Sequence, residues 1–352
     1  MVAELGRVVI LGAGALGTLV GAYLLKGGLP VIFIGRPGSI EALQAGDLVL
    51  ERPWHRPYLL PRVRAASGLG DLAPRELADV SLVVLTTKVH DTALAVADLA
   101  SYLPLDVPLL VLQNGVGGVE LAREQIGARP LIAGTATLVA SRPAPGVVRN
   151  ASRRGGVGVA SVTAVAGTLE RSAFLLASGL PVRTYTDYRA MVWSKLLLNI
   201  LGNALPAIVA RPPERVFADL ALCRLEVAAF REALAVMRAQ GLAPVSLPGW
   251  PVPLIARLLD GLPLTALHRL LPYLVAHGRG GKPPSLQVDL ERGLRESEVE
   301  YLNGAVVRTG RELGVAVPAN ALIYRTLSAM AQGSIPRDAY VANPHSLLAP
   351  LR

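Results

Sequence analysis

Residues 7–25 read RVVILGAGALGTLVGAYLL, and this stretch decides the fold. Its first five residues have the aliphatic, β-branched composition of a buried strand, and its last seven form an apolar helical segment. The loop between them has the pattern G-x-G-x-x-G, whose glycines permit a tight turn, close approach of a pyrophosphate, and packing of the helix on the strand. Because a helix N-terminus also offers free N–H groups to phosphates, we expect a dinucleotide site here. The residues of this site are Gly12, Ala13, Gly14, Ala15, Leu16 and Gly17, and the alternative is a glycine turn that only serves packing.

The same stretch could be mistaken for a signal sequence or a membrane span. Val8 to Leu25 contains no charged residue and is long enough for either. Its four glycines are better explained by the turn and the helix packing, and no other charge-free apolar run of about 20 residues follows. A single cysteine, Cys223, suits a reducing compartment. We therefore expect a soluble, cytoplasmic protein that does not bind a membrane.

Length and composition narrow the class of protein further. A chain of 352 residues is typical of two domains, and a hydrophobic content of 52% with 17% charged residues excludes intrinsic disorder. Aromatic residues make up only 5%, which argues against a nucleic-acid partner. The net charge of +9 favours anionic ligands such as phosphorylated cofactors and carboxylate substrates, although solubility alone would also explain it.

The first half of the chain alternates short apolar strands with helical stretches, which predicts a doubly wound parallel sheet. Four runs are predicted as buried strands: Arg7–Leu11, Pro30–Ile34, Val80–Leu85 and Val107–Leu112. Asp91–Leu103 has helical spacing. Short runs at Leu131–Ala133 and Gly156–Ala160, with the glycine- and arginine-rich stretch Arg142–Gly158 around them, predict that the same sheet continues with a hairpin or edge strands.

The character of the chain changes near Asp187, after which the segments are long, rich in leucine and alanine, and helical in period. The predicted helices are Arg189–Val209, Arg215–Gln240, Pro251–Ala276 and Arg295–Leu313. We therefore expect an α/β fold, with a Rossmann-type cofactor domain over residues 1–186 and an all-helical substrate domain over residues 187–352. An extra helical insertion is expected at about 242–284, bracketed by loops at Ala243–Pro253 and Gly278–Pro284.

The end of the second predicted strand indicates which dinucleotide is bound. In such folds an acidic residue there accepts from ribose hydroxyls, whereas an arginine pairs with a 2′-phosphate. The strand VIFI is followed by Gly35 and Arg36, and no acidic residue occurs until Glu41. This favours NADP(H) over NAD(H). The alternative is that Arg36 is an ordinary exposed loop residue.

Polar residues also follow two other predicted strands, where ligands collect on an open parallel sheet. Thr86-Thr87-Lys88 follows Val80–Leu85, and Gln113-Asn114-Gly115 follows Val107–Leu112. Either loop could be an ordinary polar turn.

In the second half, Lys195, Asn199 and Asn203 recur every four residues and predict one polar stripe on an otherwise apolar helix. A solvated face that also includes Ser194 and Gly202 is the alternative, but asparagine is a poor helix former, so its repeated use favours binding. Glu298 is a carboxylate near the start of a further helix, where it could simply favour the first turn.

Three separate segments together resemble the ketopantoate reductase (2-dehydropantoate 2-reductase) family. They are the loop GAGALG at 12–17, WSKLLLN at 193–199, and PSLQVDL at 284–290 continuing to EVEYLNG at 298–304. The resemblance spans both halves of the chain. It implies a Rossmann domain followed by a helical domain, with the active site between them, and NADPH-dependent reduction of the ketone of ketopantoate to pantoate, a step toward pantothenate and coenzyme A.

The resemblance also implies roles for particular residues. Gly12 to Gly17 would hold the pyrophosphate and Arg36 the 2′-phosphate, while Lys88, Asn114 and Ala140 would line the cofactor. Lys195 matches the general acid, which agrees with the need to protonate the alkoxide left by hydride transfer. The remaining matches are to ligand-contacting residues: Asn199 and Asn203 to substrate amides, Ser285 to the serine on the substrate carboxylate, and Asn114 and Glu298 to groups that face both cofactor and substrate.

The sequence departs from the family pattern near the expected substrate. Ala204 follows Asn203 where the family usually has proline, and Arg211-Pro212-Pro213-Glu214 stands where a further asparagine is usual. The stretch 289–298 is one residue longer than usual, and the insertion at about 242–284 is longer than in compact members. A reductase of another branched or aromatic 2-oxo acid therefore stays an alternative. A non-catalytic NADP(H) sensor is a second one, against which the pairing of Lys195 with Glu298 speaks. We expect no metal site, and the sequence leaves open whether the protein is a homodimer.

Overall fold

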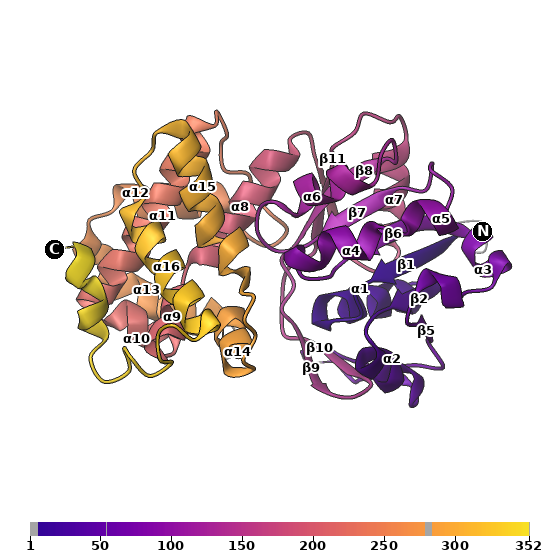
Figure 1. Ribbon diagram of the computed structural model, residues 1–352, viewed down its shortest axis with the longest axis horizontal. Helices are drawn as coiled ribbons and strands as arrows, with labels where there is room; N and C mark the ends of the chain where they lie inside the picture. Colours follow the sequence, from indigo (N-terminus) through magenta and orange to yellow (C-terminus); the bar gives the residue numbers. More distant parts are fainter. Residues whose placement is uncertain (1–5, 54, 279–283, 352) are drawn as a thin grey trace. The chain divides into compact units, whose positions relative to one another are not determined.

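The computed structural model describes residues 6–53, 55–278 and 284–351 of the chain (Figure 1). The chain forms two compact units, and each is discontinuous in sequence. The first consists of Met1–Gln113, Gly117–Val192 and Leu247–Trp250, and the second of Asn114–Val116, Trp193–Ser246 and Pro251–Arg352.

The first unit is built on an eight-stranded sheet with the order β12-β11-β8-β7-β6-β1-β2-β5. Neighbouring strands are parallel except for the antiparallel pair β8 and β11. The strands are β1 (Arg7–Leu11), β2 (Val31–Ile34), β5 (Arg64–Ala66), β6 (Val80–Leu85), β7 (Leu109–Leu112), β8 (Leu131–Ala136), β11 (Val157–Ser161) and β12 (Val182–Tyr185). This confirms the predicted Rossmann-type α/β fold, since β1 lies between β6 and β2 and is followed at once by a helix.

Helices connect these strands, as parallel pairing requires. They are α1 (Ala15–Lys26), α2 (Pro37–Gln44), α3 (Pro74–Ala78), α4 (Thr92–Val96), α5 (Leu99–Tyr102), α6 (Gly118–Gln125) and α7 (Thr168–Ala177), with the short 3-10 helices η2 (Leu69–Asp71) and η3 (Val89–Asp91). The predicted helix Asp91–Leu103 is therefore three short pieces, η3, α4 and α5.

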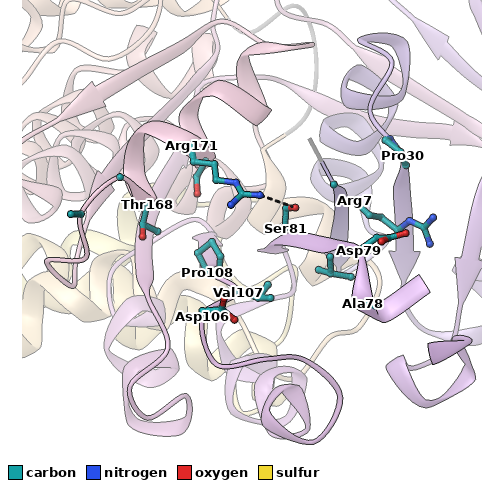
Figure 2. Close-up of a pocket in the computed structure, with 15 residues that line it drawn as sticks. Arg7, Pro30, Ala78, Asp79, Ser81, Asp106, Val107, Pro108, Thr168 and Arg171 are labelled. Atoms are coloured by element: carbon teal, nitrogen blue, oxygen red, sulfur yellow. Dashed lines mark hydrogen bonds between the residues drawn. The ribbon is translucent and has the colours of Figure 1, made fainter. Parts of the chain in front are cut away.

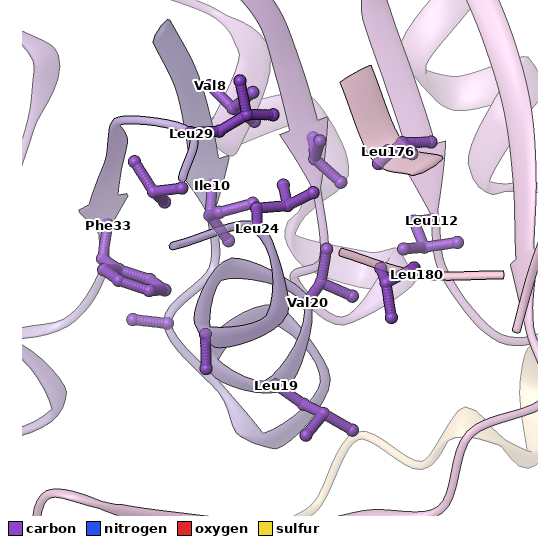
Figure 3. Packing of buried hydrophobic residues seen from close by; sticks show 14 of the residues in the cluster. Val8, Ile10, Leu19, Val20, Leu24, Leu29, Phe33, Leu112, Leu176 and Leu180 are labelled. Atoms are coloured by element: carbon purple, nitrogen blue, oxygen red, sulfur yellow. The ribbon is translucent and has the colours of Figure 1, made fainter. Parts of the chain in front are cut away.

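The core of the first unit lies where α1 packs on the central strands. Gly21 of α1 makes this packing close, because a Cβ atom there would lie 2.3 Å from Cε1 of Phe33. Figure 3 shows the hydrophobic side chains that fill this interface, and they include Val8, Ile10, Leu19, Val20, Leu24 and Phe33. The run that resembled a membrane segment is thus a buried strand, a loop and a buried helix.

The predicted continuation of the main sheet at Leu131–Ala133 and Gly156–Ala160 is confirmed, because these runs are β8 and β11, which pair antiparallel. Part of the glycine- and arginine-rich stretch between them instead forms a hairpin in a second sheet. That sheet has the order β4-β3-β10-β9 and contains β3 (Leu48–Glu51), β4 (Tyr58–Leu60), β9 (Ala140–Ala144) and β10 (Val147–Asn150). The reason is a partner far away in sequence: β10 pairs in parallel with β3, which sequence patterning had not identified as a strand. Asn150 then ties β10 to α1, since its Nδ2 donates to the Tyr23 hydroxyl at 2.9 Å.

The second unit is helical throughout its described residues, as predicted. Its helices are α8 (Tyr188–Ile200, which begins in the first unit), α9 (Ala204–Val209), α10 (Pro213–Ala218), α11 (Leu220–Ala239), α12 (Val252–Gly261), α13 (Leu264–Gly278), α14 (Ser285–Glu291), α15 (Asn303–Leu313) and α16 (Pro318–Gln332), with the 3-10 helices η4 (Glu298–Tyr301) and η5 (Pro344–Leu351). Helices α12 and α13 occupy the stretch in which an insertion was expected. The loop expected at Gly278–Pro284 falls largely outside the described residues.

The buried helix α11 holds the start of α16 by polar contacts. Glu232 accepts hydrogen bonds from the backbone N–H groups of Ala319 (2.8 Å) and Asn320 (2.9 Å). Asn320 is fully buried and donates to the carbonyl of Ala229 at 2.8 Å. Burial raises the pKa of the Glu232 carboxyl, while these donors oppose that shift.

Every long helix predicted in the second half is divided in two. Gly202 has φ of 58°, a left-handed conformation that ends α8 before α9 begins. Asp219 starts α11 separately from α10 by accepting from the N–H groups of Ala221 (3.0 Å) and Leu222 (3.2 Å). The spacing of hydrophobic residues alone does not reveal helix breaks that depend on a single residue.

Among the described residues, one helical stretch is long and apolar enough to cross a membrane. This stretch, Tyr188–Val209, is 72% buried within the protein over its most apolar window. The core helix of a soluble protein passes the same test, so the stretch is weak evidence for a membrane span.

Candidate functional site

The glycine loop follows β1, and two of its glycines are required by the protein itself. Gly12 has φ of 108°, and a Cβ there would lie 2.7 Å from the backbone nitrogen of Thr87. A Cβ on Gly17 would lie 2.1 Å from the carbonyl oxygen of Gly12. Thr86 closes the loop from β6 by donating its hydroxyl to that carbonyl at 2.8 Å.

The middle glycine is different, because nothing in the protein requires it. A Cβ atom on Gly14 would meet no atom within 4 Å, and its φ of −78° suits any residue. Gly14 also precedes α1 as its N-cap without any side-chain hydrogen bond, and the first turn of α1 carries no acidic residue. The space beside Gly14, at the start of α1, is therefore open to an incoming phosphate.

Arg36 lies at the end of β2 and precedes α2. Its side chain is 81% exposed, and its Nη2 atom lies 2.9 Å from Oδ2 of Asp91. Asp91 ends η3, in the loop after β6, and β6 and β2 lie on either side of β1 in the sheet. Sequence reasoning missed this role of Asp91, which stands three residues after Lys88 and was assigned only to the start of the predicted helix Asp91–Leu103.

Arg142 is a second arginine that sequence reasoning missed. It extends from β9, where Ala140 is buried, and its Nη1 donates to the carbonyl of Ala13 (2.8 Å) and to the hydroxyl of Ser39 (3.0 Å). Arg142 thus joins the glycine loop to α2 and adds positive charge beside both. The signal was present in the arginine-rich stretch that starts at this residue.

Gln113 organises the two polar loops that follow β6 and β7. Its Nε2 donates to the Thr87 carbonyl (3.0 Å) and to the Thr92 hydroxyl (2.9 Å). These contacts hold the backbone around Lys88, which directly precedes η3. In the first unit, the expected cofactor residues Gly12 to Gly17, Arg36, Lys88 and Ala140 are therefore linked through Thr86, Gln113, Asp91 and Arg142.

In the second unit, Asn114 and Asn199 meet directly. The Nδ2 atom of Asn199 lies 3.3 Å from Oδ1 of Asn114. The loop that carries Asn114 is also bound to η4, since the Val116 N–H donates to the Tyr301 carbonyl at 2.8 Å. Gly115 permits this contact: its φ is 89°, and a Cβ would lie 2.5 Å from that carbonyl oxygen. The loop after β7 therefore joins α8 to the segment that carries Glu298.

Asn203 lies outside α8, which corrects the prediction of one helical stripe. The left-handed Gly202 ends that helix, and Asn203 becomes the N-cap residue of α9. Its Oδ1 accepts from the backbone N–H of Leu286 at 3.4 Å, next to Ser285 at the start of α14. Asn203 and Ser285 are thus neighbours, although 82 positions separate them in the sequence.

The solvated-face alternative for this stripe is wrong for three of its five residues. Ser194 is fully buried and accepts from the Val245 N–H at 2.8 Å. Gly202 is buried, and its N–H donates to Glu226 Oε2 at 2.9 Å. Asn203 is only 7% exposed. Lys195 and Asn199 are half-buried, so the group is not a solvent-facing stripe.

Glu298 is a buried carboxylate, with 7% of its surface exposed. It begins η4 after Ser297, whose hydroxyl accepts from the Val299 N–H at 3.3 Å. The neighbouring Glu300 binds the Tyr324 hydroxyl and the Arg308 guanidinium. An acid that serves only to favour a first helical turn stays in solvent, so burial points to another role for Glu298.

A cavity in the first unit does not coincide with these residues. Figure 2 shows this cavity of about 620 Å³, which Arg7, Ser81, Pro108, Thr168 and Arg171 help to line. Arg7, Ser81 and Pro108 lie at the amino ends of β1, β6 and β7, whereas the glycine loop follows the carboxyl end of β1. In open parallel sheets, ligands bind at the carboxyl ends of strands. We therefore place the candidate cofactor site at the glycine loop.

Comparisons with known proteins give this chain a family. The family model described as ketopantoate reductase PanE/ApbA matches residues 8–162, and the model of its C-terminal part matches residues 187–331. The 2-dehydropantoate 2-reductase of Halobacterium salinarum is 30% identical over 340 residues, covering 92% of this chain and 96% of that protein. The enzyme of that name from Caulobacter vibrioides is 28% identical, covering 92% and 99%.

Solved structures agree with the sequence comparisons. The structure of a PanE/ApbA family ketopantoate reductase from Ralstonia eutropha superposes with a TM-score of 0.75 at 28% identity. The match covers 93% of this chain and 99% of that one. The two family models match both halves of the chain in the expected order, and the three segments that suggested the resemblance lie within the matched residues. This chain belongs to the ketopantoate reductase family.

Proposed function

We propose that the protein is an NADPH-dependent 2-dehydropantoate 2-reductase, which reduces the ketone of ketopantoate to pantoate on the route to pantothenate and coenzyme A. Family membership and the names of the relatives support the reaction. The observation that carries the proposal is the contact between Asn199 and Asn114, at 3.3 Å. It joins the loop after β7 to the helix that also carries Lys195, one turn before Asn199.

In this proposal residues 1–186 form the cofactor domain. Gly12 to Gly17 hold the pyrophosphate against the start of α1, where the space beside Gly14 is open. Arg36 binds the 2′-phosphate, and Lys88, Asn114 and Ala140 line the cofactor. The bound nicotinamide supplies the hydride for the substrate carbonyl carbon. NADPH is preferred because a guanidinium pairs with phosphate more strongly than with a ribose hydroxyl.

Residues 187–352 supply the substrate contacts and the proton. Lys195 is the general acid, which donates a proton to the carbonyl oxygen as hydride arrives on carbon. Its half-buried position on α8 limits competition from solvent. Asn199 holds the oxygen-bearing end of the substrate from the next helical turn. No metal takes part in this assignment.

The acyl part of the substrate is recognised by the group around α14 and η4. Asn203 uses its Oδ1 on the Leu286 N–H, so its amide hydrogens are the donors available to a substrate oxygen. Ser285 binds the substrate carboxylate. Glu298 faces both cofactor and substrate, and it accepts a hydrogen bond from the side-chain hydroxyl of ketopantoate. A carboxylate that accepts from this hydroxyl would favour ketopantoate over 2-oxo acids without it.

The test is NADPH oxidation measured with a panel of 2-oxo acids that includes ketopantoate and 2-oxoisovalerate. We expect kcat/KM to favour ketopantoate strongly, by up to about 10⁴-fold, because 2-oxoisovalerate lacks the hydroxyl from which Glu298 would accept a hydrogen bond. Glu298→Ala should remove most of that difference. Comparable values for the two acids in the unchanged enzyme would exclude the ketopantoate assignment in favour of another 2-oxo acid. Absence of turnover with every acid would favour a cofactor-binding sensor.

The proposed setting is the cytoplasm. Cys223 is buried, and burial raises the pKa of its thiol to about 11, so the reactive thiolate is suppressed.

Assembly as a homodimer stays a prediction, which light scattering of the purified protein would decide.

A further inference from the structure

The ion pair between Arg36 and Asp91 places two opposite charges where the adenosine ribose of the cofactor is expected. The guanidinium Nη2 and the carboxylate Oδ2 are 2.9 Å apart. The acid comes from the loop after β6, which lies next to β1 on the side opposite β2. The second strand itself offers no acid before Glu41, so the fold supplies an acid that the local sequence lacks.

These two side chains have opposite preferences among dinucleotides. In Rossmann-type folds an acid at the ribose accepts from the 2′-hydroxyl of NAD(H) and repels a 2′-phosphate, whereas an arginine binds that phosphate. Most such sites have one or the other. Here a ligand group that reaches the Arg36 guanidinium is also within a few ångströms of the Asp91 carboxylate.

We infer that Asp91 is a specificity-determining residue that reduces the preference of this enzyme for NADPH over NADH, which rests on the proposed cofactor role of Arg36. With NADH, Asp91 accepts from the ribose 2′-hydroxyl. With NADPH, the 2′-phosphate replaces Asp91 as the partner of Arg36 and lies close to the negative charge of the Asp91 carboxylate. The protein therefore binds both cofactors, and its preference for NADPH is smaller than it would be with Arg36 and no Asp91.

Asp91 is not needed for the local fold. It stands at the N-cap position of α4 but makes no side-chain hydrogen bond to that helix. The imidazole of His90 also lies nearby, with its Nε2 atom 3.9 Å from Oδ2 of Asp91. The side chains of Arg36 and Asp91 are 81% and 28% exposed, and exposed ion pairs contribute little to folding. The exposed guanidinium can thus exchange the carboxylate for a phosphate without disrupting the chain around it.

The test compares Asp91→Asn with the unchanged enzyme by calorimetric titration of 2′,5′-ADP, 5′-AMP, NADPH and NADH. The amide has the shape of the carboxylate without its charge. We expect the variant to bind 2′,5′-ADP and NADPH about threefold to tenfold more tightly, because the like charge is gone. It should bind 5′-AMP and NADH about threefold to tenfold more weakly, because a charge-assisted hydrogen bond is lost.

A matched control removes the same charge from another exposed ion pair of the first unit. Glu51 Oε2 lies 2.6 Å from Arg149 Nε on the second sheet, and the side chains are 30% and 50% exposed. Glu51→Gln should leave the ratio of NADPH to NADH affinities unchanged. If it raises that ratio as much as Asp91→Asn does, net charge explains the result and the inference fails.

Two further outcomes separate this inference from the function on which it rests. Parallel changes for phosphorylated and unphosphorylated nucleotides in Asp91→Asn, or no change for either, would overturn the role of Asp91. Arg36→Ala tests the cofactor assignment itself: NADPH affinity should fall about tenfold to a hundredfold, with NADH affinity little changed. If Arg36→Ala weakens the binding of NADPH and NADH equally, Arg36 does not bind the 2′-phosphate, whatever the result for Asp91→Asn.

Discussion

At the scale of single residues, the candidate site gives each side chain a distinct environment. Arg36 is exposed and pairs with an exposed acid, whereas Glu298 is buried at the start of a short helix. Lys195 lies between these extremes, half-buried on a helix whose neighbouring positions are core. A charged group outside solvent must be stabilised by specific partners, so the buried groups are those in which substitution should affect chemistry most.

Replacement of Lys195 tests the proposed proton donor. Lys195→Ala should lower kcat by about 10²- to 10⁴-fold, because a positioned general acid contributes that much. Binding of NADPH, measured by fluorescence titration, should stay nearly unchanged. Lys26 offers a matched control: its ammonium group lies 5.6 Å from the centre of the Tyr58 ring, at the end of α1. Lys26→Ala should keep normal turnover, and wild-type turnover in Lys195→Ala would return the lysine to a structural role.

At the scale of elements, the glycine loop separates what the fold needs from what the ligand needs. Gly17 is required by contact with the Gly12 carbonyl, while the space next to Gly14 is open. The same chemical change at two positions three residues apart should therefore have different consequences.

Gly17→Ala should destabilise the protein by about 1–3 kcal/mol, because the loop or α1 must move to admit the methyl group. Gly14→Ala should change the free energy of unfolding by less than about 1 kcal/mol, yet weaken nucleotide binding by about tenfold or more, because the methyl group occupies the approach of the pyrophosphate. Urea denaturation and calorimetric titration of the two variants measure these effects. Unchanged nucleotide affinity in Gly14→Ala would place the pyrophosphate elsewhere.

Elements with a strong local signal could be predicted from the sequence, and those fixed by distant partners could not. Arg7–Leu11 and Val80–Leu85 begin and end where predicted, since central parallel strands are nearly continuous apolar runs. The second sheet was missed because β10 pairs with β3, about 100 positions earlier in the chain. The breaks between long helices depend on single residues such as Gly202 and Asp219.

The same distinction holds for the candidate site. Its glycine loop is continuous in sequence and could be identified there. The contact of Arg36 with Asp91 joins positions 55 apart, and that of Asn199 with Asn114 joins positions 85 apart. Tertiary structure alone brings such pairs together, so the sequence indicated most of the residues but not their partners.

At the scale of the whole molecule, stability should depend on pH through Glu76. This residue of α3 binds Arg64 of β5 at 2.8 Å and accepts from the Ala73 N–H at 2.9 Å. The hydrogen bond from Arg64, followed by that from Ala73, lowers the pKa of the Glu76 carboxyl from 4.5 to about 2. Because the folded-state pKa is lowered, this contribution is complete above the unfolded-state value and is lost as the pH falls toward 2.

Glu76→Gln should lower the free energy of unfolding by on the order of 1 kcal/mol at pH 7. The difference between variant and wild type should shrink as the pH falls below about 4.5, since the wild-type carboxylate is progressively protonated. Urea denaturation at a series of pH values between 7 and 3 measures this trend. A difference that stays constant over the series would show that shape, and not charge, is responsible.

The two units exchange short pieces of chain, and this affects how the protein can be taken apart. Asn114–Val116 belongs to the second unit although Gln113 and Gly117 belong to the first, and Leu247–Trp250 returns to the first unit from the middle of the helical half. In that return, Pro248 accepts from the Thr137 hydroxyl at 2.7 Å. A single cut in the chain, as in recombinant expression of separate halves, would leave each fragment without a piece of its own interior. The carboxyl-terminal half would lack Asn114, which contacts Asn199. We therefore expect that neither half retains the complete candidate site when it is expressed alone.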